Sequence, residues 1–143
     1  MDPLDLTKAP PRSPREELRG LCMLPRMIDI ARAMLAGGQT GDYQIGRHKS
    51  LSAAMLGAFG LSAREFVDLI RDARTDEEVA EQLWPAASGS PDALSRRLRR
   101  ITVADVPLEV RPDFQRLYGE QAPDRLVFDV IDADDAFTFA QKA

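Results

Sequence analysis

The 143-residue sequence predicts a mainly α fold: a single-domain helical bundle of about five to seven helices, with a proline-kinked central helix and an extended N-terminal arm. Three observations support this class. At three places a serine or threonine is followed three residues later by glutamate, which is the capping-box signature of a helix start. Apolar residues recur at alternating spacings of three and four. The length, residues 1–143, suits one domain with a sizeable core.

Prolines at the start of the chain predict an extended arm over residues 1–13. Proline removes a backbone donor and biases the residue before it towards extended geometry. At the end of the arm, Ser13 is the expected N-cap of the first helix, Pro14 its first residue and Glu16 the third position of a capping box. The arm is therefore expected to lead directly into a helix.

The first helix is expected to run from Pro14 to about Ala36, where two glycines end it. Pro25 falls inside this span and predicts a kink, because its ring clashes with the carbonyl of the residue four positions earlier. We favour one kinked helix over two shorter ones, since Leu24 is a poor N-cap and the apolar register continues through the proline. The positions that carry this register are Leu21, Leu24, Ile28, Ala31 and Leu35.

Four further helices are expected between residues 50 and 101, each with a capping residue at its start. Residues 85–90 are expected to form an internal turn between the third and the fourth. The expected spans, from cap to end, are Ser50 to Gly60, Ser62 to Ala73, Thr75 to Pro85 and Ser90 to Ile101.

The C-terminal region, residues 102–143, is expected to be less regular. A short helix is predicted from Pro112 to Tyr118, ended by a glycine. The apolar run RLVFDVI, residues 125–131, predicts a strand or a buried extended segment. Asp132 is expected to cap a last helix over residues 133–141.

Composition disfavours several classes of function. The formal net charge is -4 and the pI is about 5.0, whereas nucleic-acid binders are usually basic. The arginine run at 96–100 has no interleaved aromatic residue, so we expect no nucleic-acid partner. With Cys22 and His48 as its one cysteine and one histidine, the sequence predicts no metal site and no cofactor. No apolar run or leader segment points to a membrane or to secretion, which predicts a cytoplasmic protein.

A charged stripe on the first helix is the strongest candidate site. Arg26, Asp29 and Arg32 share a sector of roughly 120° on a helix that is otherwise apolar. Confined charges need partners. We favour an ion cluster with pairing inside the helix, in which Asp29 is mostly buried and bound to one of the two arginines. The alternative is a pair of arginines, oriented by Asp29, that holds an anionic ligand.

Several motifs in the first part of the chain match a known family. They are Leu6-Thr7-Lys8, Pro11 to Glu16, Leu24 to Ala33, Gly41-Asp42-Tyr43, the segment AFGLSAREFVDLIR, and Thr75 to Val79. On these motifs the sequence resembles a bacterial domain-of-unknown-function family of small, mostly helical proteins. Where members carry an Asn-Cys-Pro-like stretch after the tyrosine, this chain has Gln44-Ile45-Gly46, so no role of that cysteine carries over. The resemblance implies a helical fold and no reaction.

The same motifs suggest that the arm, the first helix and the loop after it converge on one polar spot. The candidate ligand-binding residues are accordingly Arg12, Arg26, Asp29, Arg32 and Tyr43. The function expected is a non-catalytic module that binds a protein partner or a small anion. The alternative is a small enzyme that uses Asp29 or Tyr43, with arginines to anchor an anionic substrate. Solvent access at Asp29 separates the two hypotheses.

Overall fold

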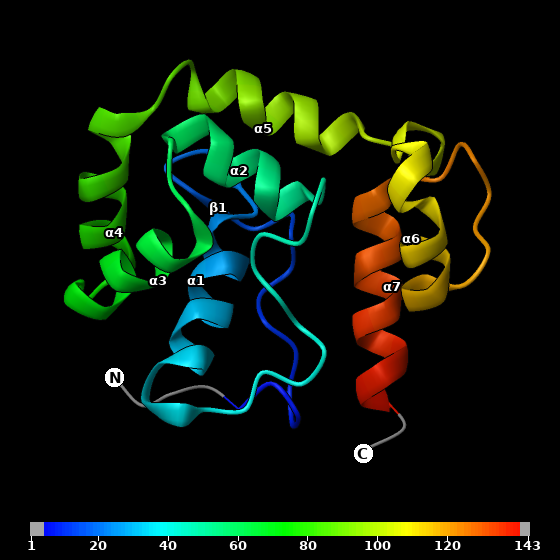
Figure 1. Cartoon of the computed structure of the whole chain (residues 1–143), viewed down its shortest axis with the longest axis horizontal. Helices are drawn as coiled ribbons and strands as arrows, with labels where there is room; N and C mark the ends of the chain where they lie inside the picture. The colour runs from blue at the N-terminus through cyan, green and yellow to red at the C-terminus, as the bar shows by residue number, and fades with distance from the viewer. Residues whose placement is uncertain (1–4, 141–143) are drawn as a thin grey trace.

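A computed structural model describes residues 5–140 of the chain and confirms a mainly α single domain (Figure 1). Its described part contains seven α-helices, four short 3-10 segments and a two-stranded hairpin. The α-helices are α1 (Leu24–Met34), α2 (Leu51–Phe59), α3 (Ala63–Asp72), α4 (Asp76–Leu83), α5 (Pro91–Arg100), α6 (Arg111–Tyr118) and α7 (Val127–Ala140). The 3-10 segments are η1 (Leu35–Gly37), η2 (Trp84–Ala86), η3 (Val103–Asp105) and η4 (Leu108–Val110). Residues 1–4 of the predicted arm and residue 141 of the predicted last helix lie outside the described residues.

The prediction of a helix from Pro14 is wrong, because a hairpin follows the arm instead. Strand β1 (Glu17–Leu18) pairs antiparallel with strand β2 (Leu21–Cys22). Arg19 and Gly20 join them with φ of 51° and 80°, the left-handed geometry that a two-residue hairpin turn requires. Ser13 caps no helix: its hydroxyl accepts from the Arg15 backbone N–H and donates to a carboxylate of α7.

The central helix is not kinked, because Pro25 lies at its start. Helix α1 begins at Leu24, so Pro25 occupies the first turn, where a missing N–H breaks no intrahelical bond. Met23 precedes the helix with φ of 72° and gives no side-chain cap. The apolar register seemed continuous because Leu21 and Cys22 of strand β2 are also buried in the core.

The four helices expected between residues 50 and 101 are confirmed, and so are their caps. The hydroxyls of Ser50, Ser62 and Ser90 each accept the backbone N–H three residues on, and Thr75 does the same. Ser62 and Glu65 form a complete capping box. These caps depend only on local sequence, which is why they could be predicted.

At the C-terminal end, the short helix α6 is confirmed and the predicted strand at 125–131 is wrong. That segment enters helix α7, whose side chains at Val127, Val130 and Ile131 are buried at helical spacing. Asp132 lies within this helix and does not cap it. An apolar run that is buried on most sides has no clear period, so the strand and helix interpretations could not be separated.

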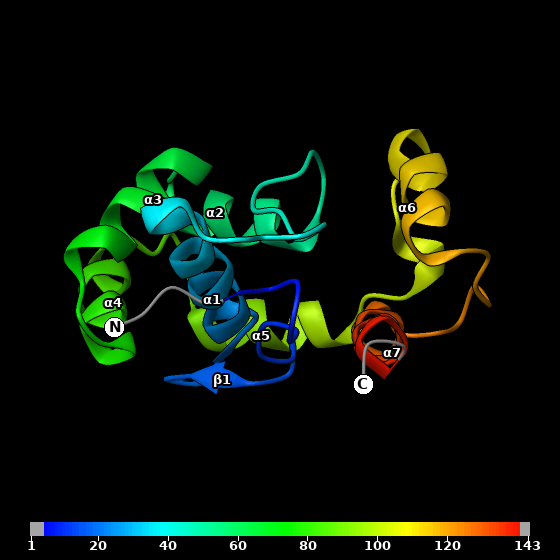
Figure 2. The same ribbon diagram turned by 90° about the horizontal axis from the view of Figure 1, so that it is seen from below.

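Helix α1 lies at the centre of the molecule, and nine of its 11 residues are buried. Helices α2, α3 and α4 surround it, and α5 crosses from this body to the pair formed by α6 and α7 (Figure 1). In Figure 2, α6 extends to the side on which α2 and α3 lie. The loop that follows α1 therefore runs between the body and the C-terminal helix pair.

The Ser62 cap gives a test of the local structure. Ser62→Ala removes the acceptor for the Glu65 N–H and is expected to lower the free energy of unfolding by about 1 kcal/mol. Ser62→Asp keeps an acceptor at the helix start and is expected to retain wild-type stability. Urea unfolding followed by circular dichroism measures both. Equal losses in the two variants would contradict the role of the cap.

Candidate functional site

The charged stripe of α1 is buried, as expected for Asp29. Arg26 and Asp29 are 6% and 7% exposed, and the side chain of Arg32 is 12% exposed. Their partners, however, lie outside α1, so the predicted pairing inside the helix is wrong. The three side chains instead connect α1 to the arm, to α4 and to α7.

Asp29 is bound by Arg12 of the arm. The Arg12 backbone N–H donates to the carboxylate at 2.9 Å, and the guanidinium adds two hydrogen bonds at 3.0 and 3.1 Å. Arg12 also donates to Asp76 at the start of α4, and so does Arg32, each at 2.8 Å. The Nη2 atom of Arg32 is buried and has no hydrogen-bond partner in the described part of the chain.

Arg26 is bound by Asp135 of α7. The two Arg26–Asp135 hydrogen bonds measure 2.8 and 3.3 Å, and both side chains are less than one-tenth exposed. The Tyr43 hydroxyl donates to the same carboxylate at 2.6 Å, and the Arg26 guanidinium lies 5.2 Å from the centre of the Tyr43 ring. Burial, and then the adjacent Asp135, raise the pKa of the Tyr43 phenol. The phenol therefore stays protonated and acts as a donor.

The five residues selected from the sequence thus belong to one network. Its remaining members, Asp76 and Asp135, were missed because they lie 44 to 109 residues from the arginines that they bind. Arginine and aspartate alternate through the network, and each guanidinium is matched by a carboxylate.

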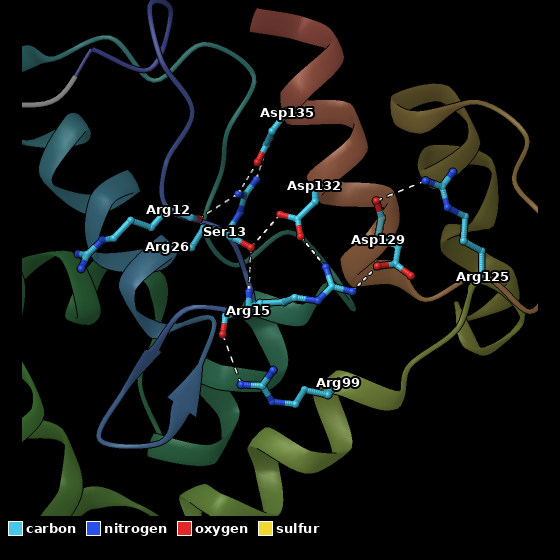
Figure 3. Close-up of polar contacts among 9 residues, drawn as sticks. All are labelled: Arg12, Ser13, Arg15, Arg26, Arg99, Arg125, Asp129, Asp132 and Asp135. Atoms are coloured by element: carbon cyan, nitrogen blue, oxygen red, sulfur yellow. Dashed lines mark hydrogen bonds and ion pairs between the residues drawn. The ribbon is translucent and has the colours of Figure 1, made fainter.

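Helix α7 presents a row of aspartates to the arm (Figure 3). Asp129, Asp132 and Asp135 are spaced three apart and so share one face of the helix. The Ser13 hydroxyl donates to Asp132 at 2.8 Å, and Arg15 forms ion pairs with both Asp129 and Asp132. Ser13 and Arg15 therefore bind α7 at Asp129 and Asp132, while Asp135 is bound by Arg26 of α1.

A groove of about 750 Å³ lies beside this network. It is bounded by α1, by the loop after it (cyan in Figure 1) and by helices α6 and α7. Apolar side chains make up much of the wall, among them Met27, Ile30, Phe114, Leu117 and Ile131. Arg26 and Tyr43 of the network reach the groove, whereas Arg12, Asp29 and Arg32 do not line it.

Many further polar side chains line the groove, and three of them are half-buried and ionisable: Arg47, Tyr118 and Asp134. Burial, and then the neighbouring carboxylate of Asp135, raise the pKa of Asp134. Burial also raises the pKa of Tyr118, whose phenol is near charges of both signs. None of the three was selected from the sequence, because nothing in its local pattern distinguishes it from a surface residue.

Across residues 5–140, no group of three or more His, Cys, Asp or Glu side chains is arranged to hold a metal ion. Among the helices of the same span, none combines the length and the hydropathy needed to cross a lipid bilayer. Within the arginine run at 96–100, Arg99 pairs with Glu17 of the hairpin.

The buried carboxylate of Asp29 predicts a large effect of its removal. Asp29→Ala leaves Arg12 without its main partner and is expected to lower the free energy of unfolding by about 3–5 kcal/mol. Asp68→Ala breaks the exposed pair with Arg71 on α3 and is expected to cost about 0–1 kcal/mol. Urea unfolding of both variants measures the difference. Similar losses would show that Asp29 is solvated.

The lowered pKa of Asp76 predicts that the stability of the fold decreases at acidic pH. Burial acts to raise its pKa, but hydrogen bonds and charges from Arg12 and Arg32 outweigh it and hold the pKa below its ordinary value. Its contribution to stability is therefore present above about pH 4, the range of an unfolded carboxylate, and is lost as pH falls through the lower folded value. The stability difference between wild type and Asp76→Asn is expected to shrink as pH falls from about 5 to 2. Parallel pH profiles would contradict this.

Comparison with known proteins places the chain in a family. A family model described as a domain of unknown function, DUF5069, matches residues 8–136. The match extends well beyond the motifs recognised in the first part of the sequence. No curated protein matches the chain. The matched span includes the arm, the central helix and the aspartate row of α7, and this chain therefore belongs to the DUF5069 family.

Proposed function

We propose that the chain is a non-catalytic binding module of the bacterial cytoplasm and that its ligand is a small amphipathic molecule held in the groove. The observation that carries this proposal is the groove itself. Its volume of about 750 Å³ falls in the range of small-molecule sites, about 300–1,000 Å³. Apolar side chains form about half of its lining and polar or charged side chains the rest, so it offers both kinds of contact that a small amphipathic molecule needs.

The balance of charge favours a structural role for part of the predicted site. Arg12, Asp29 and Arg32 are matched within the network and lie away from the groove. A guanidinium already bound to a carboxylate has little to offer a small anion. Arg26 and Tyr43 line the groove, but both are bound to Asp135, so they are candidates for contact with the body of a ligand rather than for pairing with an anion.

The alternative of a small enzyme has less support. Asp29 is buried and accepts three hydrogen bonds from Arg12, so its carboxylate is not open to a substrate. The Tyr43 phenol is engaged with Asp135, and its raised pKa disfavours the phenolate that a catalytic base would require. Both observations favour binding over catalysis.

A small molecule is also favoured over a protein partner. The large apolar side chains exposed in the described residues lie on four different elements: Met34, Leu108, Leu117 and Phe137. The groove gathers more apolar surface in one place than these separate positions do. It is therefore the better candidate for recognition.

The neutral dye Nile red, whose fluorescence rises in apolar surroundings, tests the groove directly. Wild type is expected to bind it in a saturable manner. Thr138→Trp places a bulky side chain in the groove wall and is expected to weaken dye binding at least about tenfold, because an indole fills space the dye needs. A fluorescence titration measures both affinities.

Ala136→Trp is the matched control, since residue 136 is exposed on the same helix and does not line the groove. Its dye affinity is expected to equal that of wild type. Thermal unfolding of both variants checks that each is folded. The proposal fails if Nile red does not bind the folded protein, or if the two tryptophan variants bind it equally.

A further inference from the structure

Two side chains of the described chain combine partial burial, ionisable character and the lack of a polar partner. Arg47 is half-buried, and its side chain makes no hydrogen bond and no ion pair with residues 5–140. The other arginine side chains of this span that lack a partner are exposed. Asp134 is the corresponding half-buried carboxylate. Removing a charge from water without giving it a partner costs free energy. Each of the two side chains would therefore be stabilised by a ligand group of opposite charge.

Both unmatched charges line the same groove. They also act on one common neighbour, the phenol of Tyr118: Asp134 raises its pKa and Arg47 lowers it. Across residues 5–140 no ion pair joins Arg47 to Asp134, although both line the groove and both act on the Tyr118 phenol. A ligand in the groove that carries both signs of charge would meet both side chains.

We propose that the groove binds a zwitterion with an apolar body: a free apolar α-amino acid or a short apolar peptide with free termini. Its ammonium group pairs with Asp134, its carboxylate with Arg47, and its side chains contact the apolar wall. Guanidinium offers a fork that matches a carboxylate, and an ammonium group donates readily to an aspartate. This inference rests on the proposed function and names the ligand class.

Ligands with one charge satisfy the site less well. A purely anionic ligand pairs with Arg47 but gives Asp134 no partner. Asp134 then stays beside the carboxylate of Asp135, which disfavours the ionised form of Asp134. A purely cationic ligand relieves Asp134 and leaves Arg47 without a partner. A zwitterion meets both requirements with no net charge added to the groove.

Displacement of Nile red by a matched series tests the charge requirement. The series consists of phenylalanyl-leucine, its N-acetyl form, which keeps only the carboxylate, and its C-terminal amide, which keeps only the ammonium. The free dipeptide is expected to displace the dye at concentrations at least about tenfold lower than either modified form, because each loses one charged contact. Free phenylalanine and leucine, assayed alongside, distinguish an amino-acid site from a peptide site.

Two variants assign the contacts. Asp134→Asn is expected to weaken the dipeptide at least about tenfold and to leave the N-acetyl form unchanged. Arg47→Gln is expected to weaken the dipeptide similarly and to leave the amide form unchanged. Arg100→Gln and Asp124→Asn, at exposed positions outside the groove, are the matched controls and are expected to bind as wild type.

The outcomes separate this inference from the proposed function. If the dye binds the groove but the three dipeptide forms displace it equally, or one single-charge form displaces it best, the zwitterion inference is overturned and the groove remains a binding site. Loss of dipeptide binding in the exposed control variants would also overturn it. If the dye itself does not bind, the proposed function fails first.

Discussion

The buried ion pair between Arg26 and Asp135 is the interaction on which the rest of the arrangement depends. It joins the central helix to the last one, and it also orients Tyr43 of the loop between them. Moving two charges out of water is costly, and a buried pair often adds little net stability compared with apolar packing. What such a pair does impose is geometry, because any displacement of α7 would leave a guanidinium and a carboxylate unmatched. The groove wall formed by α7 is set by this constraint.

The arm extends the same principle. Arg12 links the arm to α1 and α4, while Ser13 and Arg15 link it to α7. Three helices that are distant in sequence, α1, α4 and α7, are thus held by three residues of one short segment, Arg12, Ser13 and Arg15. This explains in physical terms why an extended, proline-rich segment is folded against the body, since its polar side chains complete pairs that the helices cannot complete among themselves.

The sequence predicted what is encoded locally. The caps at Ser50, Ser62, Thr75 and Ser90 were predicted because each cap and the N–H that it binds are three residues apart. The hairpin was missed because its turn has Arg19, a non-glycine residue, at positive φ. The usual sequence patterns of two-residue turns do not include arginine at that position. The five candidate residues lie in one network, but the carboxylates of α4 and α7 that bind the arginines were missed, because ion pairs across 44 to 109 residues leave no trace in the spacing of one sequence.

Charge in this protein falls into two groups with different consequences. The network of Arg12, Arg26, Asp29 and their partners is matched, and matched charges resist motion and hold elements in register. Arg47 and Asp134 are half-buried and unmatched, so the protein without ligand retains their desolvation cost. In natural proteins, local sequence pattern, core packing and charge pairing usually all favour the same structure. Residues that break this agreement, such as unpaired buried charges, are concentrated at functional sites. The matched network fixes the position of α7, which forms part of the groove wall. The two unmatched charges in the groove are where a ligand would contribute the most free energy.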